Sequence, residues 1–486
     1  MIVVLDIGTS NMRAAILDGA AKVLNLECVK YDLKIGGSGQ VEMDMNVFDH
    51  ALSTVLSATA SFCQSNGIHA RAIVLTSQRS SVIPVDSKGH ALYKALMWQD
   101  TRSTFICEEF SPYREEIYQI AGVRLSPVFS APKIVYLKRS MPELYEKSYK
   151  LIGFAEYTIN KLCGVFATDT SYASRSAMFD IHYLTWSNRL LDLFSVDYEK
   201  LCPIVPVGSV ISDTTGWVKG LFGYPIPVVS AGGDQQCAAL GNGCFQNSDI
   251  MANLGTGAYV LALADHVTSD PKMRLSINVS AIPGMWVYEG AVLSAGKTLD
   301  WVNRTFFAEP GEQHPYQRFT IASRNSPAGA NGLCFDINFA GKGTPQWDPS
   351  RRGSITNLNF SNTKDDIARA VMEGIAFEIG ECVEVVESVI ESKSANIHVS
   401  GGLCRDELQN EILSAVLQKQ VVYTKEVEAT ILGAWMSASV TIGYFETVAS
   451  AYQAAKQHGG FKNYRASDDL VAIYQNIKER NREYTR

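Results

Sequence analysis

Residues 2–18 combine the residue types needed to hold a phosphate and a divalent metal ion. An apolar run leads into a carboxylate, a small hydroxyl-bearing turn and an arginine on a second apolar run, in the order Asp6, Gly8, Thr9, Ser10 and Arg13. A glycine lets the backbone approach a ligand closely, and hydroxyl and backbone N–H groups can hold phosphate oxygens. Asp6, at the end of the first run, would face Mg²⁺. The pattern predicts a strand, a tight turn and a returning strand, and an ordinary hairpin with a solvated aspartate fits it equally well.

The same pattern returns at residues 249–265, and this repeat favours the phosphate interpretation. Laid over the first copy without a gap, Gly255, Thr256 and Gly257 fall on the Gly-Thr-Ser turn. An internal repeat of this kind indicates a duplicated domain. Two such turns facing each other across a cleft would hold a polyphosphate from both sides. Only the first copy carries the carboxylate needed for the metal, because Asn253 stands at that position in the second.

Another candidate carboxylate lies at a predicted strand-to-helix turn in the middle of the chain. The predicted strand 227–230 is followed by Gly232, Gly233, Asp234 and Gln235, and then by a short predicted helix. Two glycines leave room for a substrate, and an aspartate at a helix N-terminus often fills the N-cap position. The two roles are compatible, because a carboxylate in a cleft can cap a helix and also accept a proton from a substrate hydroxyl.

Two polar clusters in the first half could contact a substrate. Gln78 and Arg79 follow the predicted strand 72–76, at the point where an open α/β sheet delivers side chains to a cleft. Trp98 has polar neighbours and could offer a carbohydrate a stacking face. The plainer alternatives are a solvated surface arginine at position 79 and a core tryptophan at position 98.

Two glycine-containing segments of the second half could contact a nucleotide. Gly401 and Gly402 repeat the strand, glycine pair and helix order, and bare backbone there could admit a flat ring such as adenine. The Gly-Lys-Thr sequence at 296–298 fits a loosened P-loop pattern and is a competing signal. However, apolar residues recur at helical spacing from Val292 to Val302, so we interpret this segment as a helix and the match as accidental.

Length and composition indicate an ordinary globular protein of two domains. At 486 residues the chain is too long for one core, and the repeat places the join near residues 241–247. The net charge of −7 argues against a nucleic-acid-binding surface. Ten cysteines are scattered singly, without metal-ligand spacing, which predicts free thiols in a reducing compartment. No signal peptide or membrane span is predicted, and we expect a cytoplasmic protein.

Together these motifs resemble those of the FGGY family of carbohydrate kinases over essentially the whole chain. The resemblance implies an α/β protein with two ribonuclease-H-like domains of the actin-like ATPase superfamily around a central cleft. Residues 1–243 would form the N-terminal domain with the substrate site and catalytic base, and residues 244–486 the C-terminal domain that binds ATP. The cofactors would be ATP and Mg²⁺, and the partner a small sugar or polyol, with neither nucleic acid nor a membrane. Family members are commonly dimers or tetramers, which makes a homodimer or homotetramer the expected assembly.

The resemblance also implies roles for individual residues. Asp234 matches the general base that takes the proton from the attacking hydroxyl, and Asp6 matches the ligand of Mg²⁺. Substrate contacts are implied for Gln78, Arg79, Trp98, Asp234 and Gln235. Nucleotide contacts are implied for Asp6, Thr9, Ser10, Arg13, Gly255, Thr256, Gly257, Gly296, Asp300, Gly401, Gly402 and Asp406. In glycerol kinases amides stand at the positions of Asp300 and Asp406.

The resemblance leaves the substrate open. The pair Gln78-Arg79 resembles glycerol kinases, but Ser80 stands where those enzymes carry an acid and Val128 where they carry a substrate-contacting tyrosine. Xylulose kinases have a methionine-histidine pair in place of the glutamine and arginine. The segment 267–285 resembles autoinducer-2 kinases. A ketopentose, glycerol or another polyol, and the autoinducer-2 precursor are therefore all candidates.

Two other classes of protein are alternatives. A non-catalytic member of the same superfamily would close on ATP and a metabolite without transfer, and the presence of both Asp6 and Asp234 counts against it. A P-loop NTPase would depend on Lys297 instead of Asp6. Phosphorylated product distinguishes the first alternative from a kinase, and replacement of Lys297 distinguishes the second.

Overall fold

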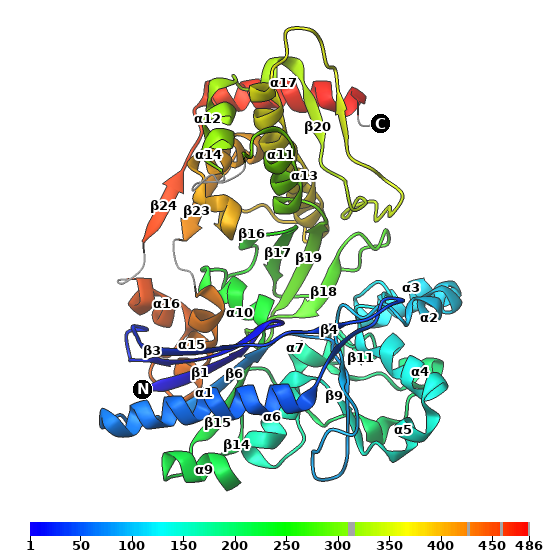
Figure 1. The fold of residues 1–486 in the computed structure, drawn as a ribbon, viewed down its shortest axis with the longest axis vertical. Coiled ribbons are helices and arrows are strands. Elements are labelled where there is room, and N and C mark those ends of the chain that lie inside the picture. The colour runs from blue at the N-terminus through cyan, green and yellow to red at the C-terminus, as the bar shows by residue number, and fades with distance from the viewer. Residues whose placement is uncertain (310–315, 425–427, 457–459, 485–486) are drawn as a thin grey trace.

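In the computed structural model, each half of the chain builds one large mixed β-sheet (Figure 1). The structure describes residues 1–309, 316–424, 428–456 and 460–484. The first sheet has the strand order β14-β15-β6-β1-β2-β3, and the second has the order β18-β19-β17-β16-β22-β23-β24. In Figure 1 the two sheets follow one another along the long axis of the molecule, with the N-terminal sheet at the bottom.

The first sheet is built on the N-terminal hairpin. β1 and β2 pair antiparallel, β3 continues the antiparallel order, and β6 and β15 extend the other side in parallel. Its strands are β1 (Ile2–Ile7), β2 (Asn11–Leu17), β3 (Val23–Lys30), β6 (Ala72–Ser77), β14 (Val210–Asp213) and β15 (Pro227–Gly233). All residues of β1 and β6 are buried, which explains why both strands are nearly continuous apolar runs.

The second sheet repeats the topology of the first. β16 and β17 pair antiparallel, β19 continues on one side, and β22 and β23 extend the other side in parallel. This is the same five-strand arrangement as β3-β2-β1-β6-β15, so the duplication and the ribonuclease-H-like fold predicted from the sequence are confirmed. Its strands are β16 (Ile250–Leu254), β17 (Ala258–Ala264), β18 (Ser276–Val279), β19 (Trp286–Val292), β22 (Asn396–Ser400), β23 (Gln420–Thr424) and β24 (Phe461–Tyr464).

Helices and short strands surround the two sheets. The helices are α1 (Met45–Ser65), α2 (Thr104–Glu109), α3 (Arg114–Ala121), α4 (Ser130–Ser140), α5 (Pro142–Lys147), α6 (Phe154–Cys163), α7 (Thr170–Ala173), α8 (Asn188–Phe194), α9 (Gly216–Phe222), α10 (Asp234–Gly241), α11 (Gly296–Phe306), α12 (Gln317–Asn325), α13 (Lys364–Val389), α14 (Glu407–Leu417), α15 (Ala429–Thr441), α16 (Val448–Lys456) and α17 (Asp468–Tyr484). The short strands are β4 (Lys34–Ile35), β5 (Val41–Met43), β7 (Ile83–Val85), β8 (Ala95–Leu96), β9 (Lys150–Ile152), β10 (Thr168–Asp169), β11 (Phe179–Asp180), β12 (Thr185–Trp186), β13 (Ile204–Val205), β20 (Cys334–Asp336) and β21 (Ser354–Thr356). In the part of the chain that the structure describes, every helix is too short or too polar to cross a membrane.

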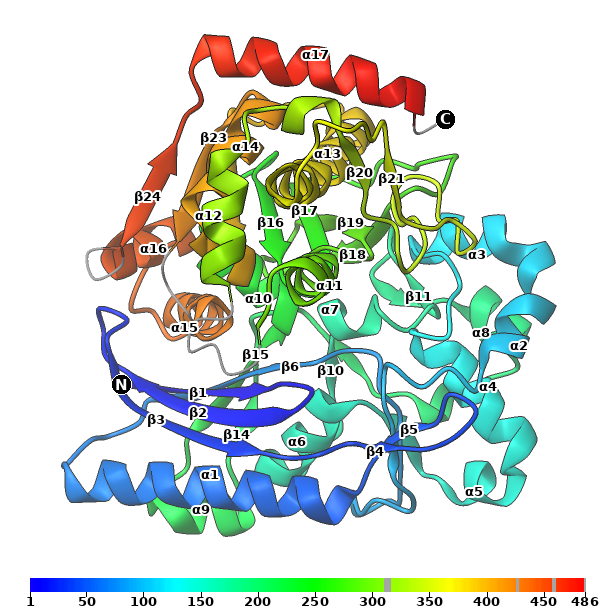
Figure 2. The ribbon, with the colours of Figure 1, turned by 45° about the horizontal axis from the view of Figure 1, so that its top comes forward.

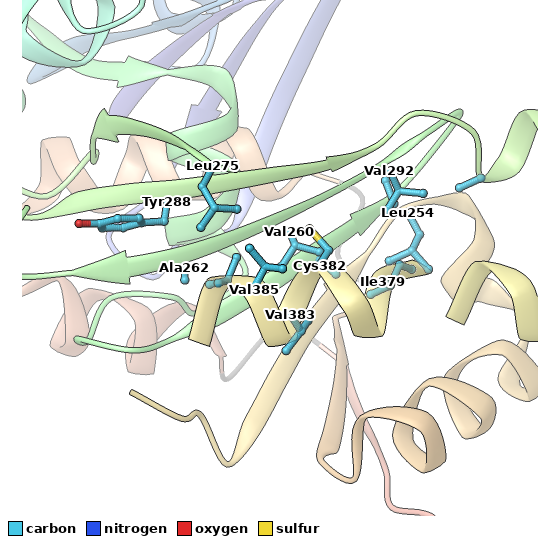
Figure 3. Packing of buried hydrophobic residues seen from close by; sticks show 14 of the residues in the cluster. Leu254, Val260, Ala262, Leu275, Tyr288, Val292, Ile379, Cys382, Val383 and Val385 are labelled. Atoms are coloured by element: carbon cyan, nitrogen blue, oxygen red, sulfur yellow. The ribbon is translucent and has the colours of Figure 1, made fainter. Parts of the chain in front are cut away.

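The long helix α13 supplies much of the core of the second half. Ile379 and Cys382 lie on its buried stripe and pack with Val260 of the second sheet (Figure 3). A Cβ atom at Gly290 of β19 would lie only 2.3 Å from the Cys382 sulfur. The helix therefore lies directly on the strand, and this contact requires a glycine.

Helix α15 lies within the predicted C-terminal domain in the sequence but packs on the first sheet. Ile431, Ala434 and Trp435 of α15 belong to a buried cluster that contains Ile2 and Val4 of β1. The two views agree that α15, from the orange end of the chain, lies against the N-terminal sheet (Figure 2). A helix from the C-terminal half therefore covers one face of the N-terminal sheet, which a local sequence pattern could not indicate.

α15 also packs backbone to backbone against α10, the helix that begins at Asp234. A Cβ atom at Gly433 would lie 1.9 Å from the carbonyl oxygen of Cys237, and one at Gly241 would lie 1.9 Å from that of Ala429. These distances are far below van der Waals contact, so a side chain at either position would push the two helices apart. The glycine pair therefore sets the position of α10 on the sheet.

We expect Gly433→Ala to destabilise the protein by about 1–3 kcal/mol, because overpacking of a buried contact costs that much. The melting temperature and the urea midpoint should both fall. Gly220→Ala is a matched control, because the Cβ position at Gly220 in α9 is open. That control should leave stability unchanged or raise it by up to about 1 kcal/mol, the helix propensity difference. Equal effects of the two substitutions would contradict the packing argument.

Candidate active site

The first Gly-Thr turn connects β1 and β2, and Asp6 and Arg13 lie opposite each other beside it. Their Cα positions are register partners in the antiparallel pair. The Arg13 guanidinium donates to the Asp6 carboxylate, with Nε at 3.1 Å, and also pairs with Glu428 just before α15. Burial raises the pKa of Asp6, and the charge of Arg13 acts in the opposite direction. Arg13 is thus shared between two carboxylates instead of pointing freely into the cleft.

Asp6 fits a magnesium ion that takes its other ligands from water and phosphate oxygens. Its side chain is almost fully buried, and Asp6 lies one residue before the end of β1, an inner strand of the first sheet. Within the described ranges, no group of three or more His, Cys, Asp or Glu side chains could hold a metal ion. This arrangement is compatible with Mg²⁺, which usually keeps several waters and binds proteins through one or two carboxylates.

Gln78 and Trp98, which we predicted to contact the substrate, brace the first turn in this structure. Gln78 Nε2 donates to the Gly8 carbonyl oxygen at 3.1 Å, and Trp98 Nε1 donates to Thr9 Oγ1 at 3.1 Å. Ser10, the last residue of the turn, is exposed. The polar atoms of both side chains are therefore bonded to the first Gly-Thr turn.

The second Gly-Thr turn connects β16 and β17 and rests on the start of α11. The backbone N–H groups of Ala295 and Lys297 donate to the Thr256 carbonyl oxygen at 3.0 Å, and that of Gly296 donates to Gly255 at 3.0 Å. A Cβ atom at Gly296 would lie 2.5 Å from the Gly255 carbonyl oxygen. The carbonyl oxygens of the second turn thus accept hydrogen bonds from the first N–H groups of α11. The absence of a side chain at Gly296 permits this close contact.

This arrangement bears on the P-loop alternative and corrects one detail of our interpretation. The segment is not helical throughout, because Val292 ends β19 and the helix begins at Gly296. A P-loop cradles phosphate with the free N–H groups of its turn. Here the amides of residues 295–297 are already bonded to carbonyl oxygens, and the Lys297 side chain is exposed. The Gly-Lys-Thr match therefore lacks the geometry of a P-loop.

Beside the second turn lies a cavity of about 600 Å³, a size suited to a nucleotide. Six of the predicted nucleotide residues line it, namely Gly255, Thr256, Gly296, Asp300, Gly402 and Asp406. The sequence did not identify Tyr316, Phe319, Arg324 and Met372, which also line it. Among them, the aromatic and apolar side chains of Tyr316, Phe319 and Met372 give the cavity a surface on which a flat ring can pack.

Gly401 and Gly257 lie next to this cavity without lining it. Gly401 has φ +99°, and a Cβ atom there would lie 2.4 Å from the Leu254 carbonyl oxygen. A Cβ atom at Gly257 would lie 2.6 Å from the Val292 carbonyl oxygen. Both glycines thus allow neighbouring strand ends of the second sheet to approach one another closely.

The two predicted aspartates of the nucleotide site have partners on the cavity wall. Asp300 accepts a hydrogen bond from the Tyr316 hydroxyl. Asp406 pairs with Arg324 at 2.7 Å and caps α14 by accepting from the Leu408 N–H at 3.0 Å. These contacts join α11, α12 and α14 around the cavity, so both acids also stabilise its walls.

Asp234 lies at the N-terminus of α10, with its side chain 27 % exposed. Our N-cap prediction is wrong by one residue, because Gly233 is the N-cap and Asp234 is the first helical residue. Its Oδ1 accepts from the Gln235 N–H at 2.8 Å and lies 3.4 Å from Arg79 Nε. Burial raises the pKa of Asp234, Arg79 opposes that shift, and the negative charge of Asp6 adds to it. The two carboxylates are therefore close enough to interact electrostatically.

Buried hydrogen bonds hold the turn that precedes Asp234. Gly232, with φ +97°, accepts from Thr76 Oγ1 at 2.9 Å and from the Tyr172 hydroxyl at 2.8 Å. The Gly233 N–H donates to Ser171 Oγ at 3.1 Å, and Ser171 Oγ in turn donates to Asp169. These hydrogen bonds hold the backbone from which the Asp234 side chain projects.

Sequence reasoning missed Glu289, which lies beside Arg79. Glu289 lies on β19, and its carboxylate is 3.7 Å from Arg79 Nη2 and 3.5 Å from Arg175 Nη1. Arg175 also lies over the Phe129 ring at 4.8 Å. The residues come from distant segments, so no local spacing relates them. The only available signal was a glutamate within an otherwise apolar buried strand.

We expect Arg79→Met to move the acidic limb of the pH profile of kcat/KM toward higher pH. Arg79 lowers the pKa of Asp234, whereas burial raises it. Loss of Arg79 should therefore raise this pKa and favour the neutral acid. The proposed base, Asp234, must be ionised to act. As the pH is lowered, activity should therefore begin to fall at a higher pH than in the wild type. Arg189→Met, which removes an exposed pair with Glu116, should leave the limb in place. An unshifted limb in Arg79→Met would show that this arginine does not tune the base.

Comparison with known proteins identifies the family. A model of the N-terminal domain of the FGGY family of carbohydrate kinases matches residues 1–241, and a model of the C-terminal domain matches residues 250–442. The chain therefore belongs to the FGGY family of carbohydrate kinases. Such an enzyme is a phosphotransferase with an alcohol group as acceptor, and ATP with Mg²⁺ serves its reaction.

Individual relatives span nearly the full chain. Glycerol kinase of Mycoplasmoides gallisepticum is 28% identical over 481 residues, which cover 95% of this chain and 92% of that protein. Gluconate kinase of Lactobacillus acidophilus has a TM-score of 0.90 at 23% identity, covering 99% of this chain and 97% of that one. Plasmodium falciparum glycerol kinase with ADP has a TM-score of 0.90 at 22% identity, covering 100% and 98%. The two structures show the shared fold.

Proposed function

We propose that the protein transfers the γ-phosphoryl group of MgATP to a hydroxyl of a small sugar, polyol or related metabolite, with Asp234 as general base. The observation that carries this proposal is the placement of Asp6 and Asp234 at one edge of the first sheet. In the parallel strands β1, β6 and β15, Asp6 lies opposite Thr76 and Thr76 lies opposite Gly232. Two strand spacings put the backbone at Asp6 roughly 10 Å from the turn before Asp234. A phosphoryl group and an attacking hydroxyl fit between them.

Asp234 is suited to accept the proton of the acceptor hydroxyl. Burial raises its pKa and makes it a better base, while the Arg79 charge favours its ionised form. A general base of this kind contributes about 10²- to 10⁴-fold to the rate. In phosphoryl transfer most of the remaining catalysis is positioning and charge neutralisation, so the fixed turn before Asp234 matters as much as its basicity.

The nucleotide would bind in the cavity beside the second Gly-Thr turn. Gly255, Thr256 and Gly257 would face its phosphates from one side, and the turn of Thr9 and Ser10 would face them from the other. Gly296, Gly401 and Gly402, with Asp300 and Asp406, would surround the adenosine part. Mg²⁺ at Asp6 would neutralise charge on the transferred group. Arg13, between Asp6 and Glu428, keeps positive charge near the same position.

We further propose that residues 1–243 carry the substrate site and base and that residues 244–486 carry the nucleotide site. The two sheets fall on either side of this boundary, whereas α15 crosses back to the first sheet. The ten cysteines are all free thiols, which supports a reducing location such as the cytoplasm.

An acceptor panel tests the proposal. ADP release with MgATP should be measured for glycerol, erythritol, pentitols, ketopentoses, ketohexoses, gluconate and the autoinducer-2 precursor. Acceptor-dependent turnover that yields a phosphate ester in equal amount to ADP supports the kinase and names its acceptor class. Nucleotide binding without turnover on any acceptor would favour the non-catalytic alternative.

A further inference from the structure

Lys133 is a fully buried lysine near the start of α4. Its Nζ atom donates to three successive carbonyl oxygens, those of Pro127 at 2.5 Å, Val128 at 2.7 Å and Phe129 at 3.3 Å. Lysine is almost never fully buried unless its charge is paired, and a cation near a helix N-terminus opposes the helix dipole. This position therefore costs free energy, and the hydrogen bonds to the three carbonyl oxygens offset that cost.

The three hydrogen bonds require the charged form of this side chain, because an ammonium group has three N–H donors and a neutral amine has two. Burial lowers the pKa of Lys133 to about 7. Among the groups that face it, Asp100 and Cys107 oppose this shift and Arg175 adds to it. Burial raises the pKa of Cys107 to about 12, so this thiol stays neutral where the lysine titrates. The number of donors that hold the three carbonyl oxygens therefore changes near neutral pH.

The ammonium group of Lys133 fastens the loop 127–129 to α4. The loop lies near the surface, since residues 126–128 are partly exposed. The N–H groups of Val128 and Phe129 donate to Ser126, at 3.4 Å and 3.1 Å, so these hydrogen bonds stay within the loop region itself. The carbonyl side of the loop is held by Lys133 instead.

This loop supports the charged side chains that surround the proposed base. The Arg175 guanidinium lies over the Phe129 ring, 4.8 Å from its centroid. Arg175 lies 3.5 Å from Glu289, and Glu289 lies 3.7 Å from Arg79. Arg79 in turn lies 3.4 Å from Asp234. A displacement of the loop would remove the aromatic face from Arg175 and allow this row of charges to shift. The position of the loop is thus coupled to the charges beside Asp234.

We propose that Lys133 is a positioning residue whose ammonium group fixes the loop 127–129 and, through the Phe129 ring, the Arg175 guanidinium, so that loss of its proton lowers activity at alkaline pH. This inference rests on the proposed function. When the proton is lost, one of the three carbonyl oxygens loses its donor, and an unmade hydrogen bond of a buried group is costly. The loop then relaxes, and the charges around Asp234 are less well placed for phosphoryl transfer.

Lys133→Gln tests the inference, because the amide keeps two N–H donors and cannot be ionised. With glycerol, xylitol and xylulose as acceptors, kcat/KM at about pH 6.5 should be about 10-fold lower than in the wild type, the usual effect of losing a hydrogen bond to a charged group. As the pH is raised to about 9, the wild type should fall to within about twofold of the variant. The KM for ATP should change less than about twofold at every pH, since the cavity beside the second turn is lined by residues between Leu254 and Gln409.

Lys150→Gln is the matched control. Lys150 Nζ also donates to two backbone carbonyl oxygens, those of Glu199 at 2.6 Å and Leu201 at 2.8 Å, but neither residue belongs to the ion pairs around Asp234. The ratio of variant to wild-type activity should therefore be the same at every pH for this control. A purely structural role for Lys133 predicts the same constant ratio for Lys133→Gln, and that result would overturn the inference.

Amide hydrogen exchange of the segment 124–135 separates this inference from the proposed function, because it needs no turnover. Exchange should be faster in Lys133→Gln than in the wild type at about pH 6.5 and equal in the two proteins at about pH 9. If exchange behaves in this way but no acceptor is phosphorylated, only the kinase proposal fails. If an acceptor is phosphorylated but exchange and the pH profile are the same in both proteins, only the inference fails.

A measurement on the wild type alone does not depend on the variant folding. The protection of the segment 124–135, corrected for the intrinsic effect of pH on exchange, should fall between about pH 6.5 and pH 9. Constant protection over this range would overturn the inference.

Discussion

Asp234→Asn should lower kcat by about 10²- to 10⁴-fold, the usual contribution of a general base. The amide keeps the shape of the side chain and its oxygen can still accept from the Gln235 N–H, so α10 should begin at the same residue. Only the ability to take a proton is lost. Initial rates of ADP release with a saturating acceptor measure the effect.

Two controls accompany this prediction. The Kd for ATP should stay within about twofold of the wild type, because the cavity beside the second turn does not include Asp234. The melting temperature should also be unchanged or slightly higher, since a partly buried carboxylate is replaced by a neutral group. If Asp234→Asn retained full turnover, the proton would have to leave by another route and the assignment of the base would be wrong.

Asp6→Asn should lower kcat by about 10²-fold or more, because the metal-binding carboxylate helps to neutralise charge on the transferred phosphoryl group. Arg13 would lose one of its two carboxylate partners but keep Glu428. The dependence of the rate on Mg²⁺ concentration should shift to higher values. That shift distinguishes loss of a metal ligand from general damage to the hairpin.

Lys297→Ala is the counterpart of this experiment. A P-loop lysine contacts the phosphates, and its loss would abolish nucleotide turnover. Here the Lys297 side chain is exposed and the N–H groups at the start of α11 are bonded to the second turn. We therefore expect Lys297→Ala to leave kcat and the KM for ATP within about twofold. The reverse result, with Lys297 essential and Asp6 dispensable, would favour the P-loop alternative.

The hairpin repeat was predictable because each of its two copies is a short, continuous sequence pattern. In each copy an apolar run, a glycine-bearing turn and a returning run follow one another directly, so β1-β2 and β16-β17 could be read from residue types alone. The buried stripe of α13 (Lys364–Val389) is likewise a local pattern, because its apolar residues recur at helical spacing over many turns. Periodicity over many residues averages out the exceptions at single positions.

Contacts between distant segments were not predictable from local patterns. α15 looks like any apolar helix in sequence, and only the assembled fold shows that it covers the first sheet. Glu289 becomes interesting only when β19 brings it to Arg79 and Arg175. Both cases depend on how two sheets are placed relative to each other, and a spacing along one segment carries no information about that.

The direction of side chains at strand ends could not be predicted from the sequence either. Gln78 and Trp98 were predicted to contact a substrate, but their polar atoms bond to the first turn. A one-residue difference likewise moved Asp234 from the N-cap to the first turn of α10. Helix boundaries vary by a residue or two in such predictions, and a side chain at that boundary changes its role with the shift.

Transfer of the terminal phosphoryl group to an acceptor tests the account most directly. The protein should be incubated with ATP labelled with ³²P in the γ position, Mg²⁺ and the acceptor panel, and the products should be separated. We expect the label in a phosphate ester of one acceptor class in the wild type, and no such product from Asp234→Asn. Label released only as inorganic phosphate, or retained in ATP with every acceptor, would contradict phosphorylation of a hydroxyl by this protein.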